Sequence, residues 1–124
     1  MEDVSTGELA QIIFIAMNTR DLSALERHLS ATAIFDFPGA GRIEGSRRIL
    51  IFLKALFRKY PRLRFTVDDI LVAGQRACIV WTNEGESARG TVYKNSGVTL
   101  VRLSCGKIDF ISDYFKDTSF VEQI

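Results

Sequence analysis

The sequence predicts an α+β fold in which helices pack on one face of an antiparallel sheet. Apolar residues recur at helical spacing through the first half of the chain, and the hydrophobic period changes to two after Pro61. The chain has 124 residues, of which 47% are hydrophobic and 25% are charged. This composition fits a globular domain with its own core, and we expect one domain spanning residues 1–124.

Three helices are expected before the main strands. In the first, apolar residues spaced three and four apart between residues 9 and 17 form one buried face. A polar break at 18–21 precedes a shorter helix at 21–29, and the stretch 33–37 reads as a short strand that Pro38 ends. The third helix runs from Ser46, a plausible N-cap, to about Tyr60, with Pro61 as its stop.

Four strands follow, separated by turns that contain glycine. They are expected at residues 63–74, 76–85, 90–106 and 107–115. Helices first and a meander of strands afterwards predict that the helices cover one face of the sheet.

The last strand carries aspartates in an otherwise apolar run. Strict alternation places Asp109 and Asp113 on the side of Ile111 and Phe115. A carboxylate in such a place is solvated, paired with a cation such as Arg89 or Arg102, or held in a cavity that shifts its acidity.

The opposite side of the sheet would be too apolar for water, which predicts a homodimer through this face. Its expected interface residues are Trp81, Phe110 and Tyr114. Strong curvature or a β-bulge, which mixes the two faces, is the alternative without a partner.

Composition bears on partners and cofactors. The formal charge is +1, so neither nucleic acid nor a membrane is an expected partner. Cys78 and Cys105 lie far apart and His28 is the single histidine, so we expect no metal and no cofactor. No signal peptide or membrane-spanning run is evident, and the expected location is the cytoplasm.

The order of elements, the segment "DFPG" at 36–39 and the closing "GKIDFISDYFKDTSF" at 106–120 resemble the SnoaL-like proteins of the nuclear transport factor 2-like superfamily. A second likeness lies in "WTNEG" at 81–85 with Gly90, Tyr93, Asn95 and Gly97. Members of this superfamily with known activities include polyketide cyclases, limonene epoxide hydrolase and ketosteroid isomerase. The resemblance implies a cone, in which a curved antiparallel sheet of cystatin-like kind wraps around the N-terminal helices and encloses an apolar pocket.

The resemblance also suggests site residues. Asp113 matches the hydrolase's acid/base aspartate, Asp36 its water-positioning asparagine and Glu86 its second pocket aspartate. The hydrolase also has an arginine between its two aspartates that balances their charges, and this sequence has Glu84 at that position. The hydrolase's catalytic set of two aspartates and an arginine is therefore incomplete in this sequence.

The ketosteroid isomerase constellation is not kept either. Its general base matches Phe37, or Asp36 with a slip of one residue. Ile13 and Thr99 replace its two oxyanion donors. A polyketide cyclase needs one pocket aspartate, which Asp113 can supply.

Two functions are therefore expected for the sequence. In the first, a small hydrophobic or polyketide-like molecule binds in the pocket, and Asp113 with Asp36 acts as acid/base in a cofactor-independent isomerase, cyclase or hydrolase. The second is a non-catalytic ligand-binding or dimeric assembly module. The expected pocket residues are Ile13, Phe52, Glu86, Asn95, Thr99, Ile111 and Phe115.

Overall fold

The computed structural model describes residues 5–118. Its helices are α1 (Thr6–Ala10), α2 (Ile12–Thr19), α3 (Ser23–His28) and α4 (Ser46–Lys59). Its strands are β1 (Leu29–Phe37), β2 (Gly41–Glu44), β3 (Arg64–Ala73), β4 (Arg76–Glu86), β5 (Val92–Ser104) and β6 (Lys107–Phe115). These elements confirm the predicted α+β class, and none of the helices in the described range is long and apolar enough to cross a membrane.

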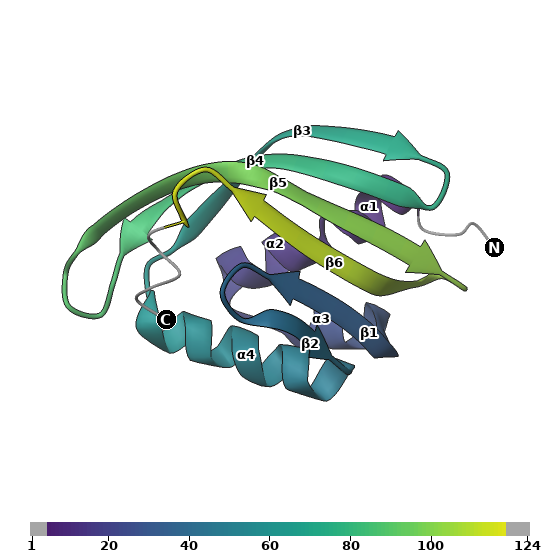
Figure 1. The fold of residues 1–124 in the computed structure, drawn as a ribbon, viewed down its shortest axis with the longest axis horizontal. Helices are drawn as coiled ribbons and strands as arrows, with labels where there is room; N and C mark the ends of the chain where they lie inside the picture. The colour runs from purple at the N-terminus through teal and green to yellow at the C-terminus, as the bar shows by residue number, and fades with distance from the viewer. Residues whose placement is uncertain (1–4, 119–124) are drawn as a thin grey trace.

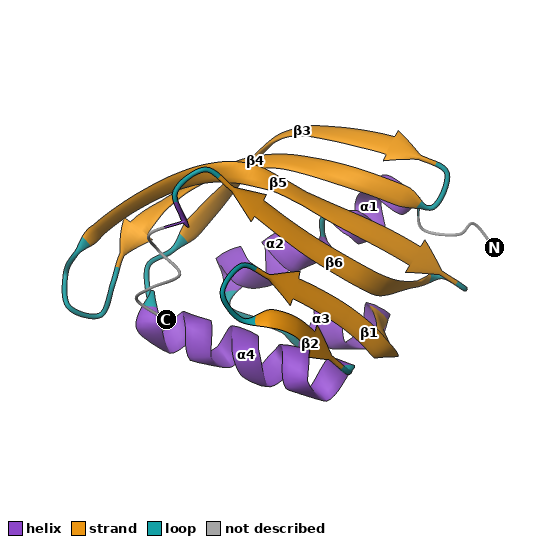
Figure 2. Cartoon of the chain, in the orientation of Figure 1, coloured by secondary structure: helices purple, strands orange, loops and turns teal. Residues whose placement is uncertain are grey.

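The six strands form one sheet in the order β2-β1-β6-β5-β4-β3. Neighbouring strands are antiparallel except β1 and β6, which are parallel. The long strands arch over α1 and α2, and α4 lies below β1 and β2 (Figure 1). The sheet is curved and does not close, and all the helices lie on its concave side (Figure 2).

The helices differ from the prediction in detail. The first predicted helix is interrupted at Gln11, where the chain makes a tighter turn and the Gln11 N–H donates to the Glu8 carbonyl. The N-cap position of α4 is Gly45 rather than Ser46, and its φ of 95° is a conformation that suits glycine. Strand β2 was not predicted, because a four-residue strand beside Pro38 and three glycines has too little hydrophobic pattern to be recognised.

Two polar side chains hold α2 in place beneath the sheet. The Asn18 amide donates to the Phe65 carbonyl at 2.9 Å and accepts from the Phe65 N–H at 2.7 Å. The Arg20 guanidinium donates to the carbonyls of Tyr60 (2.9 Å) and Leu63 (3.4 Å) just after α4. Arg20, the C-cap residue of α2, therefore ties the end of this helix to the turn that follows α4.

Close approach of β5 and β6 requires a glycine at position 97. A Cβ atom there would lie 2.2 Å from the Tyr114 carbonyl oxygen and 2.7 Å from the Phe115 Cα, which no side chain allows. Gly97 pairs with Phe115 at the end of β6, and Thr99, two residues further along β5, pairs with Asp113.

Candidate active site around Asp113

A small cavity lies between the concave face of the sheet and helices α2 and α4. Its void measures about 40 Å³. Seven of the fifteen residues that line it are aromatic, so the walls favour a flat, unsaturated occupant. The lining residues are Ile13, Phe14, Met17, Phe35, Phe37, Leu53, Leu56, Leu63, Phe65, Trp81, Asn83, Tyr93, Thr99, Asp113 and Phe115.

Asp113 is the one ionisable carboxyl group in this lining. It has intermediate exposure as a residue, because it borders the cavity instead of filling the core. Burial away from water raises the pKa of Asp113 from its ordinary value of 3.8 to about 7, and a hydrogen bond from Thr99 opposes part of that rise. None of the ion pairs among the described residues includes Asp113, so no paired cation lowers the pKa of this carboxyl group.

A directed chain of hydrogen bonds ends on this carboxyl. The Trp81 Nε1–H donates to the Thr99 Oγ1 at 2.9 Å, and the Thr99 hydroxyl donates to the Asp113 Oδ1 at 2.6 Å. An indole N–H can only donate, so the Thr99 oxygen accepts there and turns its own proton toward Asp113. The proton of neutral Asp113 then belongs on Oδ2, the carboxyl oxygen that Thr99 does not contact.

Strand register places these three side chains together. Thr99 on β5 lies directly opposite Asp113 on β6 and Ile79 on β4, and Trp81 is two residues from Ile79 on the same face. All four therefore point to the concave side of the sheet.

The structure places four predicted site residues around the cavity: Asp113, Ile13, Thr99 and Phe115. Ile111 belongs to the core and the partly buried Phe52 packs against it, but both lie outside the lining. Phe52 packs behind the cavity wall, with its ring centroid 5.0 Å from that of Phe37, and Ile111 is fully buried.

Two further predicted residues lie outside the cavity as well. Glu86 lies at the end of β4 and forms an ion pair with Arg62 at 3.6 Å, with much of both side chains in water. Asn95 joins β5 to the segment after β6 through both backbone groups of Asp117.

The prediction that Asp36 faces the cavity beside Asp113 is wrong. Phe35 and Phe37 are buried against the core on the concave side, so the residue between them points to the other face of β1. Asp36 is level with Ser112 on β6 and Arg42 on β2, and it is absent from the cavity lining.

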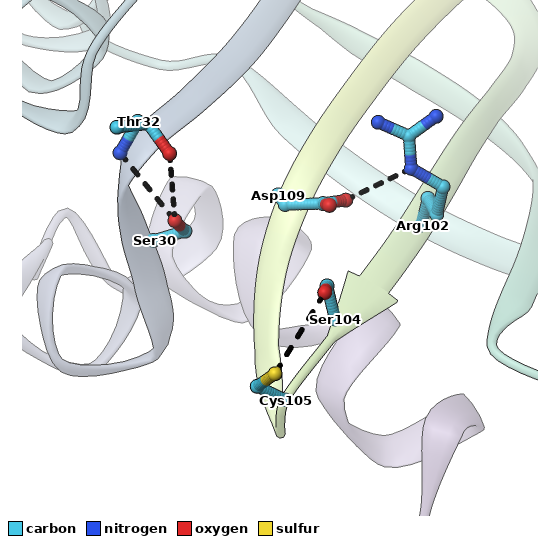
Figure 3. Close-up of polar contacts among 6 residues, drawn as sticks. All are labelled: Ser30, Thr32, Arg102, Ser104, Cys105 and Asp109. Carbon is cyan, nitrogen blue, oxygen red and sulfur yellow. Dashed lines mark hydrogen bonds and ion pairs between the residues drawn. The ribbon is translucent and has the colours of Figure 1, made fainter.

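Trp81 and Asp109 also lie on the faces opposite to those predicted. Trp81 is 3% exposed and lines the cavity, so it is not part of an outer interface. The strand register pairs Arg102 with Phe110 and Leu103 with Ile108, so Asp109 is the extra residue of a β-bulge on β6. The bulge turns Asp109 outward, where it pairs with Arg102 at 3.0 Å (Figure 3). The bulge brings Ile108 to the buried side in its place.

Sequence reasoning missed several lining residues on β3, β4 and α2, among them Trp81, Asn83, Phe65 and Met17. In the structure, residues 77, 79, 81 and 83 of β4 are buried and alternate with less buried residues, the period of two expected of a strand. Assigning that set to the concave face requires the register with β5, which the sequence does not state.

The family model of the SnoaL-like domain matches residues 11–111. The chain belongs to the SnoaL-like domain family. The match ends two residues before Asp113, so the family assignment rests on the scaffold and not on the carboxyl group. No protein among the curated sequences matches this SnoaL-like chain.

Solved structures support the same fold. A candidate polyketide cyclase from Pseudomonas putida is 26% identical, with 98% of each chain covered and a TM-score of 0.80. An NTF2-like protein of unknown function from Cytophaga hutchinsonii is 21% identical over 96% of each chain, with a TM-score of 0.76. A protein of unknown function with a cystatin-like fold from Xanthomonas campestris is 23% identical over 94% of each chain, with a TM-score of 0.84. The SnoaL-like chain therefore has the NTF2-like fold that its element order predicted.

Proposed function

We propose that this protein binds a small, flat, largely apolar molecule in the cavity and uses Asp113 to move a proton on it without a cofactor. The observation that carries the proposal is a carboxyl group in an aromatic cavity, with a pKa of about 7 and no ion-pair partner in the described chain. Near neutral pH such a group exists in both protonation states, as an acid/base catalyst needs. The similarity to a candidate polyketide cyclase supports a polyketide-like ligand.

The hydrogen-bond chain suggests how the proton moves. Thr99 holds Oδ1 of Asp113, which leaves Oδ2 to take a proton from a carbon next to a carbonyl group. The neutral acid then returns that proton to a different atom of the same molecule, so the net reaction is an isomerisation or a ring closure. Every proton removed is given back, and neither an oxidant nor a metal enters the balance.

Deuterium exchange tests the proposal without knowledge of the substrate. 2-Tetralone, a flat bicyclic ketone, is incubated with the protein in deuterated buffer at pH 7, and loss of its α-hydrogen signals is followed by NMR. The wild-type protein is expected to accelerate exchange, and the Asp113→Asn variant is expected to lose the acceleration. Asp109→Asn is the matched control, because this carboxylate lies on the same strand and pairs outward with Arg102. Equal rates in all three proteins would refute proton transfer by Asp113.

One observation favours a non-catalytic binding or assembly module as the second candidate. A void of about 40 Å³ holds only a few water molecules, so a ligand must displace side chains of the lining. If 2-tetralone shows no binding in ligand-observed NMR while the protein remains folded, the second candidate is favoured.

Cellular location and assembly are part of the same proposal. Cys78 and Cys105 are both free, as a reducing compartment would keep them, and we place the protein in the cytoplasm. We also propose a homodimer through the convex face of the sheet, where Phe110 is half-buried and Tyr114 is exposed. Phe110 lies beneath the guanidinium of Arg102, 5.0 Å from its ring centroid, so Tyr114 is the freer of the two.

A further inference from the structure

Two buried asparagines face each other across β4 and β5 but differ in their hydrogen bonds. Asn83 and Asn95 are direct partners in the strand register and are 8% and 9% exposed. The Asn95 amide nitrogen donates to the Tyr93 hydroxyl at 2.7 Å and to the Asp117 carbonyl at 3.0 Å. Its oxygen accepts from the N–H groups of Ser96 and Asp117, each at 2.9 Å. Both the nitrogen and the oxygen of the Asn95 amide are therefore hydrogen-bonded within the fold, and we assign this residue a structural role.

Asn83 is the opposite case. Its Oδ1 atom is buried and has no hydrogen-bond partner, and it is the one side-chain atom of this kind within residues 5–118. Leaving a buried acceptor unpaired is unfavourable, so an apolar residue at position 83 would suit the fold better. The unpaired Oδ1 atom therefore does not stabilise the fold.

The position of Asn83 suggests what the amide serves. Asn83 lines the cavity together with Trp81 and Asp113. It also borders a second, open and polar hollow that contains Asn95 and Lys116. Asn83 therefore lies where the aromatic cavity meets a water-accessible surface. A polar group at this position can form a hydrogen bond with a ligand that enters the cavity.

We propose that Asn83 selects the ligand: its buried carboxamide oxygen accepts a hydrogen bond from a hydroxyl or N–H group of the molecule in the cavity. The inference rests on the proposed function, since it assumes that the cavity admits a ligand. It adds a requirement that Asp113 does not set, namely a hydrogen-bond donor on an otherwise apolar molecule. A molecule without the donor leaves the amide oxygen unpaired and binds less tightly.

Strand register separates this contact from the reacting end of the ligand. Asp113 is level with Ile79 on β4, and Asn83 lies four residues further along that strand. Two strand spacings and four residues of rise place the Asn83 and Asp113 Cα atoms about 16 Å apart on a flat sheet, and the concave curvature shortens the gap between their side chains. The donor group and the reacting carbon therefore belong to opposite ends of the ligand.

A pair of probes of similar shape tests the inference. Binding of 2-naphthol, which carries a hydroxyl, and of 2-methylnaphthalene, which does not, is measured by ligand-observed NMR for the wild type, Asn83→Leu and Asp113→Asn. The wild type is expected to bind 2-naphthol about tenfold more tightly than 2-methylnaphthalene, the size expected for one buried hydrogen bond. Asn83→Leu is expected to lose the preference, and Asp113→Asn is expected to keep it.

Thermal unfolding supplies a second readout, because a structural role for Asn83 would lower the unfolding temperature of Asn83→Leu instead of maintaining or raising it. Asn83→Leu is expected to unfold at the same or a higher temperature than the wild type, because the change removes an unpaired buried acceptor. The matched variant Asn95→Leu is expected to unfold at a lower temperature, because it breaks the bonds to Tyr93, Ser96 and Asp117.

Several outcomes would overturn the inference. They are a wild type that binds both probes equally or binds neither, an Asn83→Leu variant that keeps the preference, and a preference that depends on Asp113 instead. A clear drop in the unfolding temperature of Asn83→Leu would also assign the amide to the fold. Failure of proton transfer appears separately, as a lack of deuterium exchange, and leaves the naphthol preference in place.

Discussion

Replacing Asp113 with asparagine is expected to stabilise the protein at alkaline pH and to have little effect in acid. In the folded protein the pKa of Asp113 is about 7, against an ordinary value of 3.8 in the unfolded chain. Below pH 3.8 both states bind the proton, and the stability contributed by the neutral carboxyl is fully present. Between pH 3.8 and 7 the folded state binds more protons than the unfolded state, so the free energy of unfolding falls as the pH rises.

The size of the effect follows from the same two pKa values. Each pKa unit corresponds to about 1.4 kcal/mol, so the loss across this range is about 4 kcal/mol. The carboxamide introduced by Asp113→Asn does not ionise, and its carbonyl oxygen can still accept the Thr99 hydroxyl. The variant is therefore expected to exceed the wild type by about 4 kcal/mol at pH 8, with the gain vanishing near pH 3.

Urea unfolding at a series of pH values measures this difference. Trp81 is the single tryptophan and contacts Thr99, so its fluorescence reports directly on the site. The control is Asp109→Asn, whose exposed ion pair with Arg102 predicts a difference of about 1 kcal/mol or less. A gain for Asp113→Asn that does not change with pH, or a variant less stable than the wild type at pH 8, would show that Asp113 is not held in an apolar cavity.

Two further changes have clear expected outcomes. Thr99→Val removes the hydrogen bond that favours ionised Asp113, so the pKa of Asp113 should rise above about 7 in a carbon-13 NMR titration; an unchanged or lower pKa would contradict the hydrogen-bond chain. Tyr114→Glu places a charge in the proposed dimer interface and should convert the homodimer to a monomer in size-exclusion chromatography with light scattering. Ile51→Glu is its control, since Ile51 on α4 is 59% exposed and Tyr114 58%. A monomeric wild type, or a dimeric Tyr114→Glu variant, would refute this interface.

Local patterns in the sequence were sufficient for most of the fold. Spacing of three and four identified α4, and alternation identified the four long strands near their observed limits. The same alternation fixed which side chains lie beside Asp113, since Ile111 is buried and Phe115 lines the cavity. It could also have excluded Asp36, because this residue lies between two buried phenylalanines on β1.

Register and irregularities of the strands came only from the tertiary structure. The bulge at Asp109 depends on how β6 pairs with β5, and the inward position of Trp81 depends on its pairing with Gly97. A one-residue change of register exchanges the two faces of a strand, and the sequence of a single strand does not contain that information.

The sequence by itself determined that a carboxyl group would stand at position 113 in an apolar strand, within an α+β domain of SnoaL-like type. Only the tertiary structure decided that this carboxyl accepts from Thr99, which in turn accepts from Trp81, and that the Asn83 Oδ1 atom has no hydrogen-bond partner within residues 5–118. The physical reason is the separation along the chain between the residues that interact. Helical and strand periodicity arises from neighbouring residues, whereas acidity and hydrogen-bond pairing depend on groups brought together from distant parts of the chain.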